Sequence, residues 1–177
     1  MELVKSAALA VVLKDYEKTL NNRIDQLRQH MDDYRSKAED KSLGDQMNRV
    51  ADSLADDIQI LLNGIKNLPT AISDITTVSS AQAFIYKAKR CTEAMSNNLE
   101  NIKSTKESQS SKADRTKEGL DNTHSRSNRD RLQTTLAGYL LGVRMSSAVI
   151  SATTAIFDTL AEIYPALEYT YPKVETA

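Results

Sequence analysis

The chain has 177 residues and a net charge of −1, with 40% hydrophobic and 27% charged residues. This length suits one domain with a core of its own, without disulfide or metal staples. A charge near zero excludes a general attraction to nucleic acid or anionic lipid, and a single cysteine excludes an intramolecular disulfide framework.

The first residues do not have the pattern of a cleaved signal peptide. The apolar run 7–13 follows Glu2 and Lys5 and ends at Lys14. A signal peptide has a cationic start, a longer apolar run and a cleavage site of small residues. We therefore expect the first turns of a helix here. The compartment stays open: a soluble protein, either cytoplasmic or exported without a cleaved signal peptide.

Apolar residues recur at helical spacing in four segments, of which the first two cover residues 3–38 and 43–68. The first carries a heptad pattern with alternating steps of four and three, which is typical of a helix that pairs along its length. Its positions are Leu20, Ile24, Leu27, Met31, Tyr34 and Ala38. Pro69 is expected to end the second helix because proline lacks the backbone donor. The short connection between the two predicts antiparallel neighbours.

The third segment predicts a helix over 80–103, and the pattern then fails. Between residues 103 and 131 the apolar residues are Ala113 and Leu120, while eight basic residues stand against five acidic ones. A segment with so little to bury does not offset the entropy lost on ordering. We therefore expect a mobile polar loop at about 112–129.

The fourth segment predicts a helix over 130–164 that is apolar over a wide arc, including Leu140 and Ile150. Such a helix is expected to be the most buried of the four. Small residues at a spacing of four indicate close helix packing; they are Gly138, Gly142 and Ser146. Pro165 is expected to end this helix, and the aromatic tail 165–177 is expected to be extended.

Together these patterns predict an all-α fold. We expect one domain over 1–177, an elongated bundle of about four long helices with coiled-coil-like packing.

The sequence offers little material for catalysis. Neither histidine has a glutamate three residues before it, as helical di-metal sites require: Leu27 precedes His30 and Asp121 precedes His124. Cys91 falls on the apolar stripe, where a cysteine acts as a small hydrophobe. Phosphate-binding loops, nucleophile elbows and paired-cysteine motifs do not occur. We therefore predict no enzyme activity, no catalytic, cofactor-binding or metal-binding residue, and no nucleic-acid partner.

The favoured hypothesis is a non-enzymatic protein that acts through a protein partner or as a homo-oligomer. Helix stripes and aromatic residues are the material of such interfaces. The candidate interaction residues are Leu27, Met31, Tyr34, Tyr164, Tyr169 and Tyr171.

The alternative is a membrane-active bundle, of a lipid-binding or pore-forming type, that exposes its apolar last helix. A permanent span is not expected. Arg144 lies close to the middle of any spanning window, where its insertion costs about 2.5 to 3.5 kcal/mol.

Overall fold

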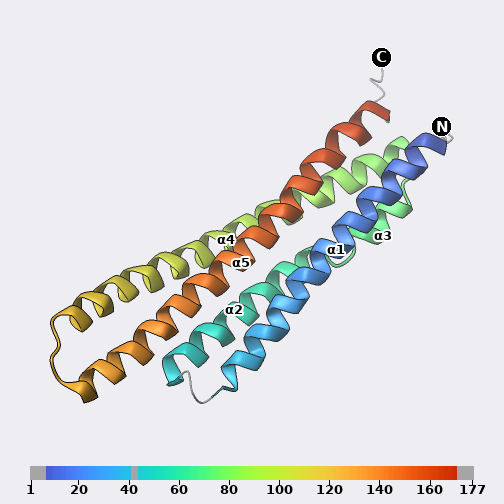
Figure 1. Ribbon diagram of the computed structural model, residues 1–177. Helices are drawn as coiled ribbons and strands as arrows, with labels where there is room; N and C mark the ends of the chain where they lie inside the picture. The colour runs from blue at the N-terminus through green and yellow to red at the C-terminus, as the bar shows by residue number, and fades with distance from the viewer. Residues whose placement is uncertain (1–6, 41–43, 171–177) are drawn as a thin grey trace.

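The structure is a computed structural model that describes residues 7–40 and 44–170, and their side chains over 11–40 and 48–167. Within those residues it contains four long helices and one short one: α1 (Ala7–Ala38), α2 (Gly44–Ile65), α3 (Leu68–Ser73), α4 (Val78–Asp121) and α5 (Arg126–Thr170). Figure 1 shows them packed as an all-α bundle, which confirms the predicted fold class. The predicted starts of the first two helices, at residues 3 and 43, lie outside the described residues.

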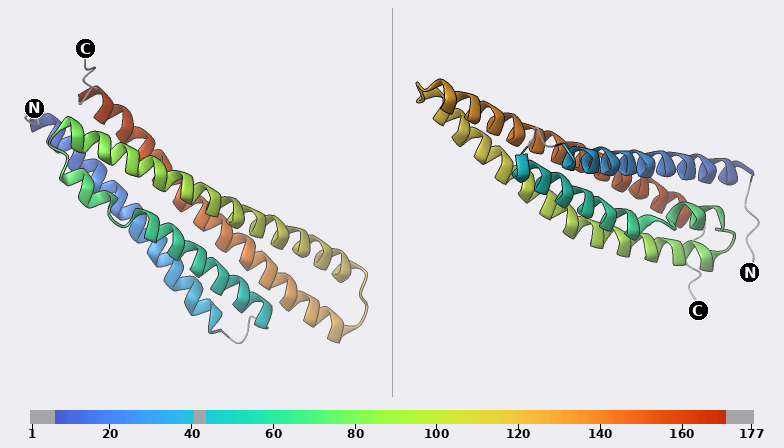
Figure 2. Two further views of the ribbon diagram at one scale, coloured as in Figure 1. Left: turned by 180° about the vertical axis from the view of Figure 1, so that it is seen from behind. Right: turned by 90° about the horizontal axis from the view of Figure 1, so that it is seen from below.

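The bundle consists of two antiparallel hairpins, α1–α2 and the longer α4–α5 (Figure 1). α1 begins and α5 ends at the same end of the bundle, where α3 lies beside α1. At the opposite end the α4–α5 hairpin extends past the ends of α1 and α2 in every view (Figure 2). α5 packs along α4, α1 and α2, so it holds the two hairpins together.

The core lies where the predicted stripes meet, which explains why these segments are helical. On α1, Leu20, Ile24 and Leu27 are at most 3% exposed. They share one buried cluster with α2 residues such as Ile58 and Leu61, both 0% exposed. A helix whose apolar residues share one side is stabilised chiefly by burying that side against a neighbour.

The second predicted helix is interrupted before its expected end. α2 stops at Ile65, and a separate short helix, α3, begins at Leu68 with Pro69 in its first turn. Proline is accepted there because the first backbone N–H groups of a helix have no partner within the helix. Leu68, Pro69 and Ile72 are buried, so this turn closes the end of the core.

The predicted polar loop at 112–129 is wrong over most of its length. α4 continues to Asp121 and only residues 122–125 connect it to α5. The extra turns lie along α5: Ala113 is 4% exposed, and a Cβ on Gly119 would lie 3.9 Å from Leu132 Cδ1. The lysine, arginine and glutamate residues of this stretch are good helix formers on the solvent side. Composition alone therefore underestimated how much packing against a single neighbouring helix stabilises helical structure in a polar segment.

The C-terminal part of the chain also differs from the prediction. α5 begins at Arg126 and runs through Pro165 to Thr170, so residues 165–170 are helical and not extended. Proline has no backbone N–H, so Pro165 removes the helical hydrogen bond to the carbonyl of Ala161 without ending the helix. Leu167, at 0% exposed, anchors the turn that follows. The rest of the predicted tail, 171–177, lies outside the described residues.

Candidate interaction surface

The structure places the three candidate residues of α1 largely inside the bundle. Leu27 is 0% exposed and belongs to the core, and Met31 is half-buried against it. Tyr34 is 5% exposed, and its hydroxyl donates a 2.7 Å hydrogen bond to the carbonyl of Met145 on α5. This stripe therefore joins α1 to its own chain and is not available to a partner in this structure.

Among the aromatic candidates near the C-terminus, the structure describes the side chain of Tyr164. Tyr164 is half-buried against the core, and its hydroxyl lies 3.4 Å from Thr92 Oγ1. Lys89 Nζ lies 5.8 Å from the centre of the Tyr164 ring. The side chain of Tyr169 and the whole of Tyr171 lie outside the described residues.

The small residues predicted for close helix packing, Gly138, Gly142 and Ser146, are all buried on α5. They lie on the inner side of the helix, the side that carries Val149 and Ile156, both 0% exposed. Their role in close helix approach stays a prediction.

Polar contacts join α5 to α1 and α4 to α2. Arg23 of α1 donates hydrogen bonds to the carbonyl of Ala155 and to Thr159 Oγ1. On the other side of the bundle, the side-chain amide of Asn98 donates a 2.7 Å bond to the carbonyl of Asp57, which joins α4 to α2. The Arg23 bonds, together with the bond from Tyr34 to Met145, tie one side of α5 to α1 and leave the opposite side facing outward.

The outward side of α5 is a surface that the sequence reading missed. We call it the outer face and define it by ten residues at steps of three and four: Arg129, Gln133, Leu136, Leu140, Arg144, Ser147, Ser151, Thr154, Asp158 and Glu162. Leu136 and Ser147 are half-buried and the other eight are exposed. Leu140, with 48% of its surface exposed, is the large apolar residue at its centre.

The outer face corrects the expectation that Leu140 is part of the core. The wide apolar arc of α5 exceeds what α1, α2 and α4 cover, so one edge of it stays in contact with solvent. Arg144, Ser151 and Asp158, spaced by seven, were the signal in the sequence, because they mark one side of the helix as polar. Ile150, also expected in the core, is half-buried against it.

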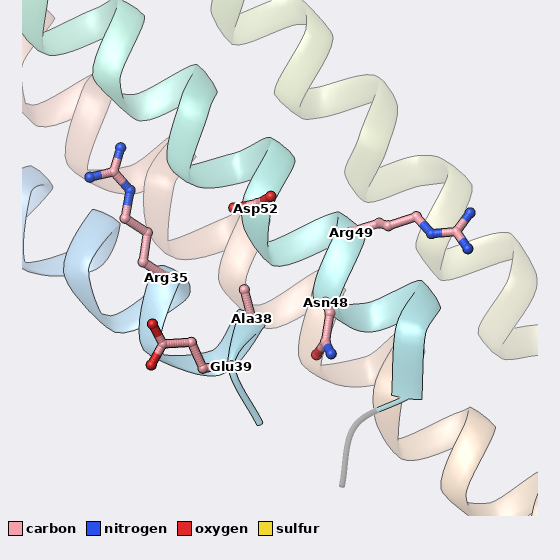
Figure 3. A pocket seen from close by; sticks show the side chains of 6 residues that line it. All are labelled: Arg35, Ala38, Glu39, Asn48, Arg49 and Asp52. Carbon is pink, nitrogen blue, oxygen red and sulfur yellow. The ribbon is translucent and has the colours of Figure 1, made fainter. Parts of the chain in front are cut away.

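Two open hollows lie at the end of α1. One, of about 510 Å³, lies between α1 and α5 and includes Asp33, Lys37 and Arg144 in its wall. The other, of about 420 Å³, lies between α1 and α2 and is shown in Figure 3. Its guanidinium groups, from Arg35 and Arg49, point away from each other, so they do not converge on one ligand position (Figure 3).

Cys91 is held as a structural residue. Its thiol donates to the carbonyl of Gly64 at a distance of 2.6 Å. Burial raises the pKa of this thiol, and the nearby Lys87 and Arg90 only partly oppose that effect. Because the thiolate is the reactive form, a raised pKa makes Cys91 a poor nucleophile at neutral pH.

Among the side chains that the structure describes, those of 11–40 and 48–167, no group of three or more His, Cys, Asp or Glu lies close enough to hold a metal ion. By length and composition the α5 residues Arg126–Leu167 are apolar enough to cross a membrane, with a mean hydropathy of 1.5 in the best window. Only 39% of that window is buried in the bundle.

The buried phenol of Tyr34 gives a pH-dependent prediction. Burial, with the nearby Asp33 carboxylate, raises the pKa of Tyr34 to about 12, against about 10 in an unfolded chain. The folded state therefore holds this proton more tightly. The buried phenol adds about 2 to 3 kcal/mol to the free energy of unfolding below about pH 10. This contribution is lost as the pH rises toward about 12.

Urea unfolding at a series of pH values measures this effect. Between about pH 9.5 and 12, the wild type should lose more stability than Tyr34→Phe, which has no phenolic proton. Parallel losses in the two proteins would show that Tyr34 does not titrate in a buried position.

Comparisons of the chain with protein-family models, with curated proteins and with solved structures found no match.

Proposed function

We propose that this protein is not an enzyme and works through protein–protein interaction or self-assembly, with the outer face of α5 as its contact surface. The observation that carries the proposal is Leu140, which is 48% exposed in the middle of a long regular helix. Leu136, one turn earlier, and Val143, beside it, are only half-buried. A helix side with apolar residues at steps of three and four is the form in which helices recognise other helices.

The surroundings of Leu140 support a contact surface. The polar residues of the outer face flank the apolar ones, as an interface rim surrounds its centre. The helix beneath is rigid because its inner side is buried against three others. A partner would therefore meet a surface already in its bound form, which lowers the entropy lost on binding.

A photo-reactive benzophenone amino acid at position 140, introduced in the native host, tests the proposal. Irradiation should give one or a few protein adducts, because the label lies in the contact surface. The matched control is the same amino acid at Tyr86, which is 65% exposed on α4. If positions 140 and 86 give the same diffuse adducts, or none, the outer face is not a contact surface.

The second candidate function is membrane activity, and the apolar composition of Arg126–Leu167 favours it. In this alternative α5 leaves the bundle and contacts lipid. This transition would cost the free energy of packing the inner side of α5 in the bundle. Insertion of the Arg144 charge would cost about 2.5 to 3.5 kcal/mol more. Flotation with liposomes tests it: co-flotation of the folded protein, or a lipid adduct at position 140, would favour membrane activity over protein contact.

A further inference from the structure

The two halves of the outer face differ in charge. The exposed cations Arg129 and Arg144 lie in its N-terminal half, whereas the exposed anions Asp158 and Glu162 lie in its C-terminal half. A second α5 laid alongside in the opposite direction therefore brings cations against anions. Laid in the same direction, it would bring like charges together, which is unfavourable.

Side-chain size is divided in the same way. The N-terminal half of the outer face carries the large residues Leu136 and Leu140, and the C-terminal half carries Ser147, Ser151 and Thr154. In an antiparallel pair, large side chains of one copy lie over small ones of the other, so that two helices approach closely.

One register satisfies both patterns. In an antiparallel pair, the residue numbers of two facing positions always add up to the same value. If residue 140 faces residue 151 of the second copy, residue 129 therefore faces 162 and residue 133 faces 158. The contacts are then Leu140 with Ser151, Arg129 with Glu162, Gln133 with Asp158 and, next to the two-fold axis, Arg144 with Ser147. Each occurs twice because a two-fold axis relates the copies, as in most homodimers.

We propose that the outer face of α5 binds a second copy of this chain, antiparallel and in this register. The inference rests on the proposed function and names the partner. The stretch from Arg129 to Glu162 is about 50 Å long at 1.5 Å per residue. With a strip about 10 Å wide, the dimer buries about 1,000 Å² in all, near the lower limit for a specific interface. The dimer is therefore weak and depends on concentration.

Sedimentation velocity of the full chain from about 5 to 500 µM tests the proposal. The wild type should shift from 19.7 kDa toward twice that mass. Leu140→Glu should prevent the shift, because it replaces the most exposed large apolar side chain of the contact by a carboxylate. Ile60→Glu is the matched control, since Ile60 is 57% exposed on α2, and it should dimerise as the wild type does.

A charge swap tests the register. Arg129→Glu alone should weaken the dimer at least severalfold at low salt, since it faces Glu162 twice. The double variant Arg129→Glu/Glu162→Arg should restore it. The two positions are 33 residues apart on one continuous helix, so rescue requires contact between copies. Circular dichroism checks that every variant keeps its helix content.

Two results would overturn the inference: a wild type that stays monomeric at every concentration, or a dimer that neither Leu140→Glu nor Arg129→Glu weakens. Absence of rescue in the double variant would exclude the antiparallel register. A monomer whose position 140 still captures a different protein in the host would exclude self-association but leave the proposed function standing. A monomer without any specific adduct at 140 would remove both.

Discussion

Leu27→Lys should unfold the protein. Leu27 is 0% exposed in the core between α1 and its neighbours, so the variant would bury an ammonium group without a partner. Buried unpaired charges and disrupted core packing together cost at least about 4 kcal/mol, a large part of the stability of a domain this size.

Thermal unfolding followed by circular dichroism measures this loss. Gln26→Lys is the matched control because Gln26 is exposed on the same helix, and it should melt close to the wild type. Met31→Lys, at a half-buried position, should fall between the two. A Leu27→Lys protein that melts as the wild type does would mean that this side of α1 faces solvent or a partner.

Ile156→Ala should destabilise the protein by about 2 to 5 kcal/mol, whereas Leu140→Ala should cost less than about 1 kcal/mol. Both changes remove an aliphatic side chain from α5, but Ile156 is 0% exposed and Leu140 is 48% exposed. The large cost at Ile156 comes from lost burial and from the cavity left behind.

Urea unfolding of dilute samples keeps self-association out of this comparison. Similar losses at the two positions would mean that α5 is buried on all sides, as its composition alone suggests. The difference between the two variants therefore measures the side of α5 that faces outward.

The sequence was sufficient for the fold class and for the inner sides of α1 and α2, because burial there follows a regular period. Leu20, Ile24 and Leu27 were on the predicted heptad stripe and are at most 3% exposed. Pattern reasoning works where each apolar residue has one neighbouring helix to meet.

Pattern reasoning failed where a segment is stabilised by a helix that is distant in the sequence. The stretch 112–121 has little to bury, yet it is helical because α5 lies beside it. Pro165 does not end α5, because Leu167 holds the following turn in the core. Such tertiary support cannot be read from local composition.

The predicted contact stripe of α1 lies inside the bundle for a related reason. The strict heptad of α1 predicts pairing but does not say with which helix, and the partners turned out to belong to the same chain. The wide arc of apolar residues on α5 predicts burial, but the number of neighbouring helices determines how much of that arc is buried. Only the arrangement in space separates Leu140 from Val149, which is 0% exposed on the opposite side of the helix.

Cysteine labelling in intact host cells tests most directly that the outer face of α5 is the working surface. In a Cys91→Ser background, Leu140→Cys and Tyr86→Cys should both react rapidly with a maleimide in dilute purified protein, since both positions are exposed. In the cell, the cysteine at 140 should react much more slowly while the one at 86 keeps its rate. If position 140 reacts as fast in the cell as in dilute solution, nothing covers the outer face and the account is contradicted.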